Sequence, residues 1–256
     1  MIHPTAIIDP SASIADDVHI GAYAIVGADV EIGSGTSVGA HTTIYGPSCI
    51  GRDNQISQHA LLGGKPQDID FKDEATQLAI GDRNVIREYV SMNRGTVKGG
   101  GLTRVADDNY LMAYVHIGHD SQVGSHNIFT NSTSLAGHVE VGDYCNLGGF
   151  TLLHQFIRIG SHAFTSMGAV VNRDVPPFVI VSGNYARSFG INKVGLKRFG
   201  FSAAKINAIR KAYKLLVRKP GERETALKQL APLAEEFSEI KVFMDFVSNS
   251  ARGIVK

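Results

Sequence analysis

Two adjacent residues, His119 and Asp120, form the most reactive pair that the sequence offers. A histidine takes up a proton near neutral pH, and a neighbouring carboxylate can orient it and stabilise its charged form. His138 follows Asp120 by eighteen positions, and Gln155 follows His119 by thirty-six. If positions eighteen apart are spatial neighbours, then His119, Asp120, His138, His154 and Gln155 share one patch of the surface.

This patch is suited to moving a proton during group transfer. His119 would act as general base on a substrate hydroxyl with Asp120 as its partner, and such catalysis typically gives roughly 10²–10⁴-fold. Gly137, eighteen positions after His119, could offer its backbone N–H to a developing oxyanion. No Ser or Cys shares these positions, so direct transfer is favoured over a covalent acyl-enzyme. The alternative is that these histidines are solvated turn residues.

A metal site is a second use for the same histidines. His116, His119 and His138 could supply three nitrogen ligands to zinc. The γ-class carbonic anhydrases carry a three-histidine zinc site on a repetitive β scaffold, with two ligand histidines five positions apart. Here His116 and His119 are three apart. We therefore expect neither a metal nor another cofactor.

A six-residue repeat is the reason for placing positions eighteen apart side by side. Every sixth residue from Ile2 to Leu62 is aliphatic, eleven in succession without a miss. The repeat resumes at Ile80, slips by one and continues to Val171, with Thr165 as its only residue that is not apolar. A period of six fits neither a helix nor a single alternating strand, and chance enrichment does not give eleven consecutive matches.

The repeat predicts a parallel β-helix in which three short strands and three tight turns close a triangular coil of eighteen residues. The aliphatic side chain points inward and stacks on its copies, with about 4.8 Å between coils. Roughly ten such coils fit between residues 2 and 175. A glycine often follows the aliphatic residue, and we expect it to take corner backbone angles that other residues avoid.

Two interruptions of the repeat are candidate functional segments. Residues 64–79 and 93–104 are expected to form loops, and loops on a rigid scaffold often carry function. A tolerated insertion is the alternative interpretation. We expect residues 1–186 to form the β-helix that carries both loops.

Residues 187–256 are expected to form a small helical domain, because the pattern changes to a helical period after the repeat ends. Ser202 is a predicted helix N-cap. Further helices are expected at about 222–236 and 238–250. The predicted apolar stripe of the first helix consists of Ile206, Ile209, Tyr213 and Leu216.

Composition narrows the classes of function without choosing among them. The 256 residues carry a net charge of +1, which argues against nucleic-acid binding. Cys49 and Cys145 are the only cysteines and lie far apart, which suits a reducing compartment rather than a disulfide framework. The N-terminus has neither a basic region nor a long apolar run, so we expect no signal peptide, no membrane span and a cytoplasmic protein.

Seven short segments carry a resemblance to a known family. They are IGDRN at 80–84, RGTV at 94–97, HIGHD at 116–120, LAGHV at 135–139, LHQF at 153–156, GLKR at 195–198 and RGI at 252–254. Over essentially its whole length the chain resembles the UDP-N-acetylglucosamine O-acyltransferases, hexapeptide-repeat enzymes of lipid A biosynthesis. These segments are far more specific than the repeat, which unrelated enzymes share.

The resemblance implies a left-handed parallel β-helix, although parallel crossovers are usually right-handed. It also implies a homotrimer with sites between neighbouring prisms. The reaction it implies is the first step of lipid A biosynthesis, in which an (R)-3-hydroxyacyl group passes from acyl carrier protein to the 3-hydroxyl of the glucosamine ring of UDP-GlcNAc.

The resemblance also assigns roles to residues of the site. His119 is the implied general base, Asp120 its partner and Gly137 the oxyanion donor, in agreement with the spacing. The implied contacts to the sugar nucleotide come from Gln67, Asp68, His116, His138, His154, Gln155, Asn192 and Arg198.

Three positions are compared with the residues that the family has there. Asn93 stands where family members often have a histidine, and Val194 stands where an acidic residue is common. Met167 stands where the family places a residue that limits acyl length. A bulky methionine there predicts a shorter acyl chain. The sequence leaves open whether the acceptor is UDP-GlcNAc or its 3-amino analogue.

The segment from 175 to 221 is strongly basic, with ten Lys and Arg residues, Lys219 among them, and no Asp or Glu. A local basic face steers an acidic partner. Acyl carrier proteins are acidic, so we expect the carrier to dock here. An ordinary solvated helix surface is the alternative, and nucleic acid is disfavoured because the segment is short.

Two other functional classes stay open. An N-acyltransferase of the same pathway would carry an extra domain before its repeats, whereas the repeat here begins at residue 2. A non-catalytic scaffold would not need His119 beside Asp120, and a zinc enzyme would contain bound metal.

Overall fold

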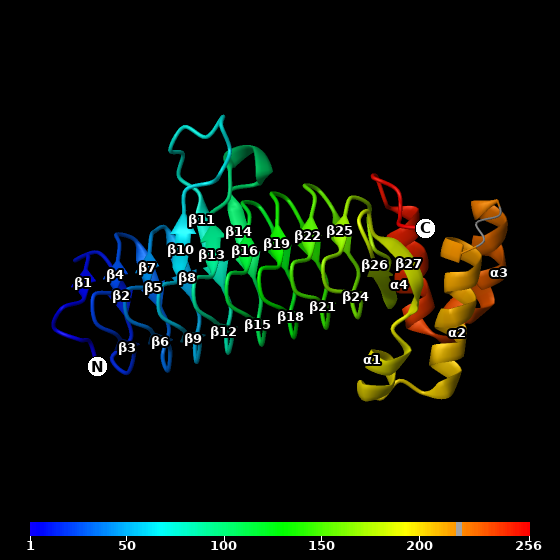
Figure 1. The fold of residues 1–256 in the computed structure, drawn as a ribbon, viewed down its shortest axis with the longest axis horizontal. Helices are drawn as coiled ribbons and strands as arrows, with labels where there is room; N and C mark the ends of the chain where they lie inside the picture. The colour runs from blue at the N-terminus through cyan, green and yellow to red at the C-terminus, as the bar shows by residue number, and fades with distance from the viewer. Residues whose placement is uncertain (219–221) are drawn as a thin grey trace.

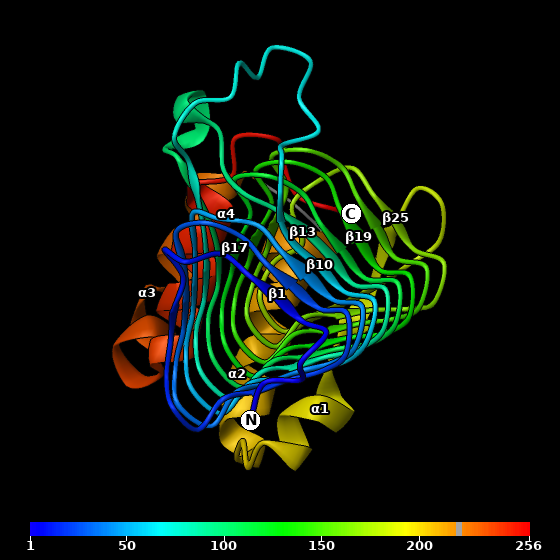
Figure 2. The same ribbon diagram turned by 90° about the vertical axis from the view of Figure 1, so that its left-hand side faces the viewer.

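The computed structural model of the protein describes residues 1–218 and 222–256, so Lys219 lies outside the described residues. Short strands wind into a long triangular prism, and helices gather at its C-terminal end (Figures 1 and 2). Each side of the prism is one sheet, and successive strands of a sheet come from successive coils. The fold is therefore the expected left-handed parallel β-helix followed by a helical region.

The strands fall into three sheets. The first sheet contains β1 (Ile7–Ile8), β4 (Ile25–Val26), β7 (Thr43–Ile44), β10 (Leu61–Gly64), β13 (Ser91–Asn93), β16 (His116–Ile117), β19 (Ser134–Leu135), β22 (Leu152–Leu153) and β25 (Val170–Val171). The second sheet contains β2 (Ser13–Ile14), β5 (Val30–Ile32), β8 (Ser48–Ile50), β11 (Gln77–Ile80), β14 (Leu102–Val105), β17 (Gln122–Val123), β20 (Glu140–Val141) and β23 (Arg158–Ile159). The third sheet contains β3 (His19–Ile20), β6 (Ser37–Val38), β9 (Gln55–Ile56), β12 (Val85–Ile86), β15 (Tyr110–Leu111), β18 (Ile128–Phe129), β21 (Asn146–Leu147), β24 (Phe164–Thr165), β26 (Val179–Ser182) and the antiparallel β27 (Arg187–Ile191).

The register between coils is the spacing on which the site prediction rests. Ile117 pairs with Leu135, and Leu135 pairs with Leu153, so each step along the prism is eighteen residues. The repeated aliphatic residues are buried inside the prism from Ile20 onward, whereas Ile2 is exposed at its open end. Apolar burial drives this stacking, and the period of six is confirmed as the pattern of the core.

Gly63 takes the corner backbone angle that we expected, with φ of 73°, but other glycines of the repeat are required for a different reason. The left-handed corner position is filled mostly by other residues, such as Tyr23 and Asp53. Gly21 and Gly33 stand one step after the inward aliphatic residue, where the next coil passes closely. A Cβ at Gly21 would lie 2.6 Å from the backbone nitrogen of Ala40, and one at Gly33 would lie 2.8 Å from backbone atoms of Gly51. Close approach of the coils, not a positive φ, selects glycine here.

Both interruptions of the repeat arise at the same corner, between the first and second sheets. One loop connects β10 with β11, and the other connects β13 with β14 through the short 3₁₀ helix η1 (Val97–Gly99). Figure 2 shows them rising together from one edge of the prism. The next coil places the turn between β16 and β17 at this corner, and that turn contains His119 and Asp120.

In the described part of the C-terminal region, four α-helices follow the last strand: α1 (Lys193–Arg198), α2 (Ala203–Tyr213), α3 (Arg223–Glu236) and α4 (Ser238–Ser248), with a π-helical turn η2 (Lys214–Arg218) after α2. Ser202 is the N-cap of α2, where its side chain accepts a hydrogen bond from the Lys205 amide, as predicted. The predicted stripe is confirmed, because Ile206, Ile209, Tyr213 and Leu216 are all buried. Among the described residues, no helix has the length and apolar character needed to cross a membrane.

An aromatic cluster around His162 joins the prism to the helical region. The imidazole stacks between Tyr144, at 5.0 Å, and Phe178, at 5.7 Å. Phe199 and Phe201 present their edges to it at 5.0 and 5.1 Å. Burial lowers the pKa of His162 below 6.5, although Asp143 and Glu239 oppose the shift.

Replacing His162 with phenylalanine is expected to make thermal unfolding less sensitive to acid. Because the folded state lowers this pKa, the unfolded chain takes up the proton first, and stability falls as the pH drops through about 6.5. Phenylalanine keeps the stacking and cannot be protonated. Melting temperatures between about pH 5 and 7.5 measure the effect, with His126→Phe as the control for losing an imidazole from the same column. An unchanged slope in His162→Phe would contradict this explanation.

Candidate active site

The turn between β16 and β17 brings the predicted acid–base pair to the corner of the prism. Asp120 takes the left-handed backbone conformation with φ of 61°, as do His138 at 60° and Phe156 at 63° one and two coils further on. These three residues form one column, and His119, Gly137 and Gln155 occupy the adjacent one through the same register. The column prediction from the sequence is therefore confirmed.

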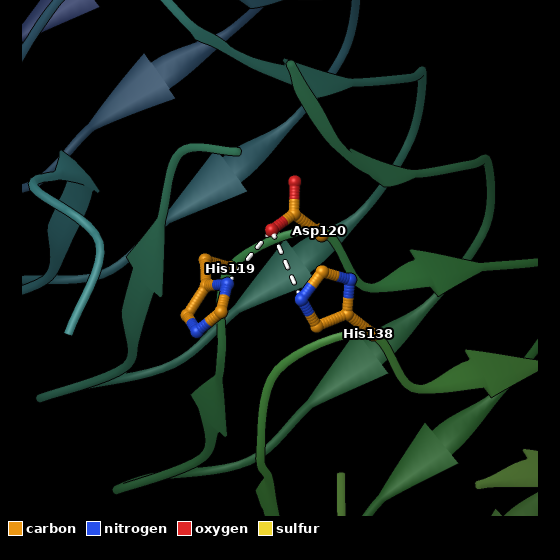
Figure 3. A group of neighbouring side chains, drawn as sticks. All are labelled: His119, Asp120 and His138. Atoms are coloured by element: carbon orange, nitrogen blue, oxygen red, sulfur yellow. Dashed lines mark hydrogen bonds and ion pairs between the residues drawn. The ribbon is translucent and has the colours of Figure 1, made fainter. Parts of the chain in front are cut away.

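The His119 imidazole is held by the Asp120 carboxylate (Figure 3). Its Nδ1 lies 2.7 Å from Oδ2 of Asp120, and the two side chains are 7% and 0% exposed. A carboxylate oxygen accepts this hydrogen bond, so Nδ1 carries the proton and Nε2 keeps its lone pair. The carboxylate therefore fixes the orientation of the imidazole.

His138 lies on the other side of the same carboxylate. Its Nε2 is 3.6 Å from Oδ2 of Asp120, and its ring meets His119 edge-on with 5.1 Å between centroids. Phe156 stacks on the outer face of His138 at 4.4 Å. Burial lowers the pKa of His138, and Asp120 opposes this shift in part. A neutral His138 can both donate and accept a hydrogen bond.

Two hollows lie beside His119, and its side chain lines both of them. The larger, of about 370 Å³, lies over the first sheet, and the smaller, of about 260 Å³, lies under the first loop. Gln67 and Gln155 line both. The larger hollow also contains His116 and Gly137, and the smaller contains Asp68 and His138. The structure thus gathers six further predicted site residues around His119 and Asp120 or in the hollows beside them.

Gly137 lies directly against the imidazole of His119. A Cβ at this position would lie 2.5 Å from Cε1 and 2.6 Å from Nε2 of His119, closer than real contacts allow. Within the described part of the chain, no acceptor takes the Gly137 backbone N–H. Gly137 therefore leaves room for the His119 imidazole and has a backbone N–H beside it that is unpaired among the described residues.

His116 occupies the floor of the larger hollow. Its Nδ1 lies 2.8 Å from Oγ of Ser91, and burial lowers its pKa. Among the described residues, no carboxylate contacts this imidazole. His116 is thus a neutral hydrogen-bonding group, and it lacks the acidic partner that His119 has.

The first loop is fixed over the site by the second. Lys98 contacts Oδ2 of Asp68 at 2.7 Å and Oδ2 of Asp70 at 3.3 Å. The hydrogen bond with Lys98 lowers the pKa of Asp68, and the same contact raises the pKa of Lys98. Asn93 adds a hydrogen bond of 2.8 Å from Nδ2 to the Lys65 carbonyl. Asn93 therefore ties the base of one loop to the other.

Four predicted residues lie away from both hollows within one chain. His154 is exposed, and its Nδ1 accepts a hydrogen bond from Arg252 at 3.0 Å. Asn192 caps α1 through the Gly195 amide and donates to the His162 carbonyl. Arg198 is exposed at the end of α1, and Met167 is exposed in the turn after β24.

The described residues contain one group that could ligate a metal, namely His119, Asp120 and His138. His116, which the zinc alternative used, is not a member. The 2.7 Å between His119 and Asp120 is a hydrogen-bond distance, shorter than the separation of about 3.3 Å between ligands of tetrahedral zinc. The group is arranged for proton sharing rather than for ligation.

Sequence reasoning did not assign a role to Thr96, Lys98, Ser91 or Phe156. The first two lie in the loop between β13 and β14 and contact Asp120 and Asp68. The eighteen-residue spacing of the coils does not apply within a loop, so it cannot relate Thr96 or Lys98 to the corner that contains Asp120. The spacing of eighteen also places Phe156 in the column of Asp120 and His138, and the structure confirms this position, but the spacing alone gives the ring no role.

The repeated coils of the β-helix define a hexapeptide-repeat protein that carries a histidine–aspartate pair at one corner. The family profile described as "Udp N-acetylglucosamine O-acyltransferase; Domain 2" matches residues 174–255. An acyl-[acyl-carrier-protein]–UDP-N-acetylglucosamine O-acyltransferase of Stenotrophomonas maltophilia is 51% identical over 256 residues, covering 100% of this chain and 97% of the relative. The enzyme of that name from Stutzerimonas stutzeri is also 51% identical, with 100% and 99% covered.

Solved structures agree with these relatives. The UDP-N-acetylglucosamine O-acyltransferase LpxA of Moraxella catarrhalis has a TM-score of 0.98 at 42% identity, with 100% of this chain and 99% of that chain covered. LpxA of Acinetobacter baumannii has a TM-score of 0.97 at 43% identity and the same coverage. The chain belongs to the UDP-N-acetylglucosamine O-acyltransferase family.

Proposed function

We propose that this protein transfers an (R)-3-hydroxyacyl group from acyl carrier protein to the 3-hydroxyl of the glucosamine ring of UDP-GlcNAc, the first step of lipid A biosynthesis. The observation that carries the proposal is His119, which lines both hollows while Asp120 holds its Nδ1 at 2.7 Å. The names of relatives about half identical over the whole chain support these substrates.

The proposed reaction is one displacement at the thioester carbonyl. His119 Nε2 removes the proton of the sugar hydroxyl, and the hydroxyl oxygen forms a bond to the carbonyl carbon. The resulting oxyanion accepts a hydrogen bond from the backbone N–H of Gly137. The carbon–sulfur bond then breaks, and the departing thiolate takes the proton from His119. Atoms and charge balance without a cofactor.

A covalent route would need a hydroxyl or thiol beside the base. The nearest such pair is Ser91 with His116, whose Oγ and Nδ1 are 2.8 Å apart. His116 has no carboxylate to orient it, and Ser91 does not line either hollow. Ser134 lines the larger hollow, but its hydroxyl donates to the Ser132 carbonyl at 3.5 Å rather than to an imidazole. Direct transfer by His119 is therefore favoured over a covalent route.

The acyl carrier protein is proposed to dock on the basic face of α1, α2 and η2. Within the described residues this face exposes Lys193, Lys197, Arg198, Lys211, Lys214 and Arg218. Lys205 is different, because Glu239 neutralises it at 2.6 Å. Six exposed cations attract an acidic partner, and the attraction weakens as salt is added.

A homotrimer is proposed because one side of the prism exposes several large apolar side chains. Ile7, Leu61 and Leu152 on the first sheet are 64%, 40% and 47% exposed. At the neighbouring corner Tyr89 stacks on Tyr114, and both rings are exposed. Exposed apolar side chains can mark interfaces, and this side also bears the larger hollow. A second copy seated here would bring its own Asn192 and Arg198 toward His119.

Mixed assemblies test the shared site. Light scattering should give three times the chain mass of 27.5 kDa. His119→Ala and Arg198→Ala chains, each weak alone, should recover activity when assembled together, because some sites then combine an intact His119 with an intact Arg198. Mixed trimers without recovery would contradict a site built from two subunits.

Met167 is proposed to limit the length of the acyl chain. Its side chain is 78% exposed in one chain, at the turn after β24, where it can extend toward a neighbour's site in the trimer. Met167→Gly is expected to shift the preferred donor to a longer acyl chain by about four methylenes, the reach of the side chain that is removed. Competition among donors of several lengths, read by mass spectrometry, measures the shift. Preference of the native protein for the longest donors would contradict this role.

The experiment that tests the proposed function is product analysis after incubation with UDP-GlcNAc and a series of 3-hydroxyacyl carrier proteins. Formation of the 3-O-acyl product supports it. A protein that acylates only the 3-amino analogue, or no sugar at all, would overturn the stated acceptor.

A further inference from the structure

The loop between β13 and β14 reaches over the buried carboxylate of Asp120. The backbone N–H of Thr96 donates to Oδ1 at 2.7 Å, and its hydroxyl donates to Oδ2, also at 2.7 Å. Thr96 is 3% exposed, and the Asp120 side chain is 0% exposed. One residue of the loop therefore supplies a donor to each oxygen of the carboxylate.

The donors of Thr96 are themselves fixed. Thr96 is the N-cap of η1, and its hydroxyl oxygen accepts the Gly99 N–H at 3.2 Å. Gly99 lies so close to Asp120 that a Cβ there would overlap the carboxylate. From the opposite side, the Asp120 N–H donates to Oγ1 of Thr103 at 2.7 Å. The carboxylate is held by the loop before any substrate arrives.

The two hydrogen bonds from Thr96 determine which carboxylate oxygen of Asp120 faces His119. Oδ2 accepts both the Thr96 hydroxyl and Nδ1 of His119. Without the hydroxyl, a buried carboxylate loses a charge-assisted hydrogen bond and can rotate or shift within the space that is freed. His119 would then lose the fixed partner that keeps its proton on Nδ1, and with it the free lone pair on Nε2.

We propose that Thr96 is a positioning residue that acts on acyl transfer through Asp120 and His119. It does not line either hollow and is not expected to touch the sugar nucleotide or the thioester. The inference rests on the proposed function, because it assigns Thr96 to the same acid–base site.

The first test compares Thr96→Val, which keeps the shape and removes the hydroxyl, with Thr96→Ser, which keeps the hydroxyl. Thr96→Val is expected to lower kcat by about 10- to 100-fold, the range for losing a hydrogen bond to a charged group. The KM for UDP-GlcNAc should change by less than about threefold, and Thr96→Ser should retain near-native kcat. A serine variant as slow as the valine variant, at native melting temperature, would overturn the assignment.

The second test asks whether the effect passes through Asp120. In the Asp120→Asn background, Thr96→Val should cost less than about threefold, because the interaction that it removes is already lost. An equal loss in both backgrounds would overturn the proposal. ¹⁵N chemical shifts of His119 give a readout that does not depend on activity: the valine variant should show a mixture of tautomers, and a tautomer as pure as the native one would also count against it. If the native protein fails to transfer acyl groups, the proposed function fails first; if only the Thr96 variants behave as native, the proposed function stands and this inference alone fails.

Discussion

His119→Ala is expected to lower kcat for acyl transfer by about 10²–10⁴-fold. The substitution removes the only imidazole that combines a carboxylate partner at 2.7 Å with a position in both hollows, within the described residues. The KM for UDP-GlcNAc should change much less, because a proton acceptor acts mainly in the transition state. Steady-state kinetics at saturating donor measure the effect.

The matched control for this substitution is His126→Ala. His126 occupies the left-handed corner position that Asp120 fills beside His119, with φ of 60°, stacks on Tyr144 and lines neither hollow. It should keep native kcat and show that loss of a corner imidazole is not in itself harmful. A fully active His119→Ala enzyme would assign the base to another group, with His116 as the first to examine.

Gly137→Ala is expected to lower activity by about 10²-fold, the cost of moving a catalytic group by a fraction of an ångström to one ångström. The added Cβ would lie 2.5 Å from Cε1 of His119, and the imidazole is bound to Asp120 and has little freedom to retreat. The backbone N–H that we propose as oxyanion donor is retained in alanine. A loss therefore reports on the position of the base.

Gly149→Ala is the control for Gly137→Ala. Gly149 stands at the corresponding place of another corner, and a Cβ there would meet nothing closer than 3.4 Å. This variant should retain native activity and native melting temperature. If Gly137→Ala is equally active, His119 does not occupy the described position during catalysis.

The sequence was sufficient to predict the column that forms the site. Successive coils of this part of the β-helix keep the same register. The eighteen-residue spacing therefore places Asp120, His138 and Phe156 above one another. The core followed for the same reason, since each aliphatic residue of the repeat has a copy one coil away.

The contacts of the two loops could not be predicted, because a loop breaks the period that relates sequence to space. Nothing in the spacing indicates that Thr96 donates to Asp120 or that Lys98 holds Asp68. The reason for glycine at Gly21 was also wrong, since a tight approach between coils cannot be distinguished from a positive φ in a sequence. Asn192 caps α1 and Arg198 is its last residue, both away from the hollows, so the roles implied for them require a second copy of the chain.

The measurement that tests the central claim most directly is the initial rate of acyl transfer with both substrates varied. Direct transfer requires UDP-GlcNAc and the acyl carrier protein to be bound together, so double-reciprocal plots should intersect, and no acylated protein should be found by mass spectrometry. Parallel lines with an acyl group on the protein would contradict direct transfer and would point to Ser91 beside His116.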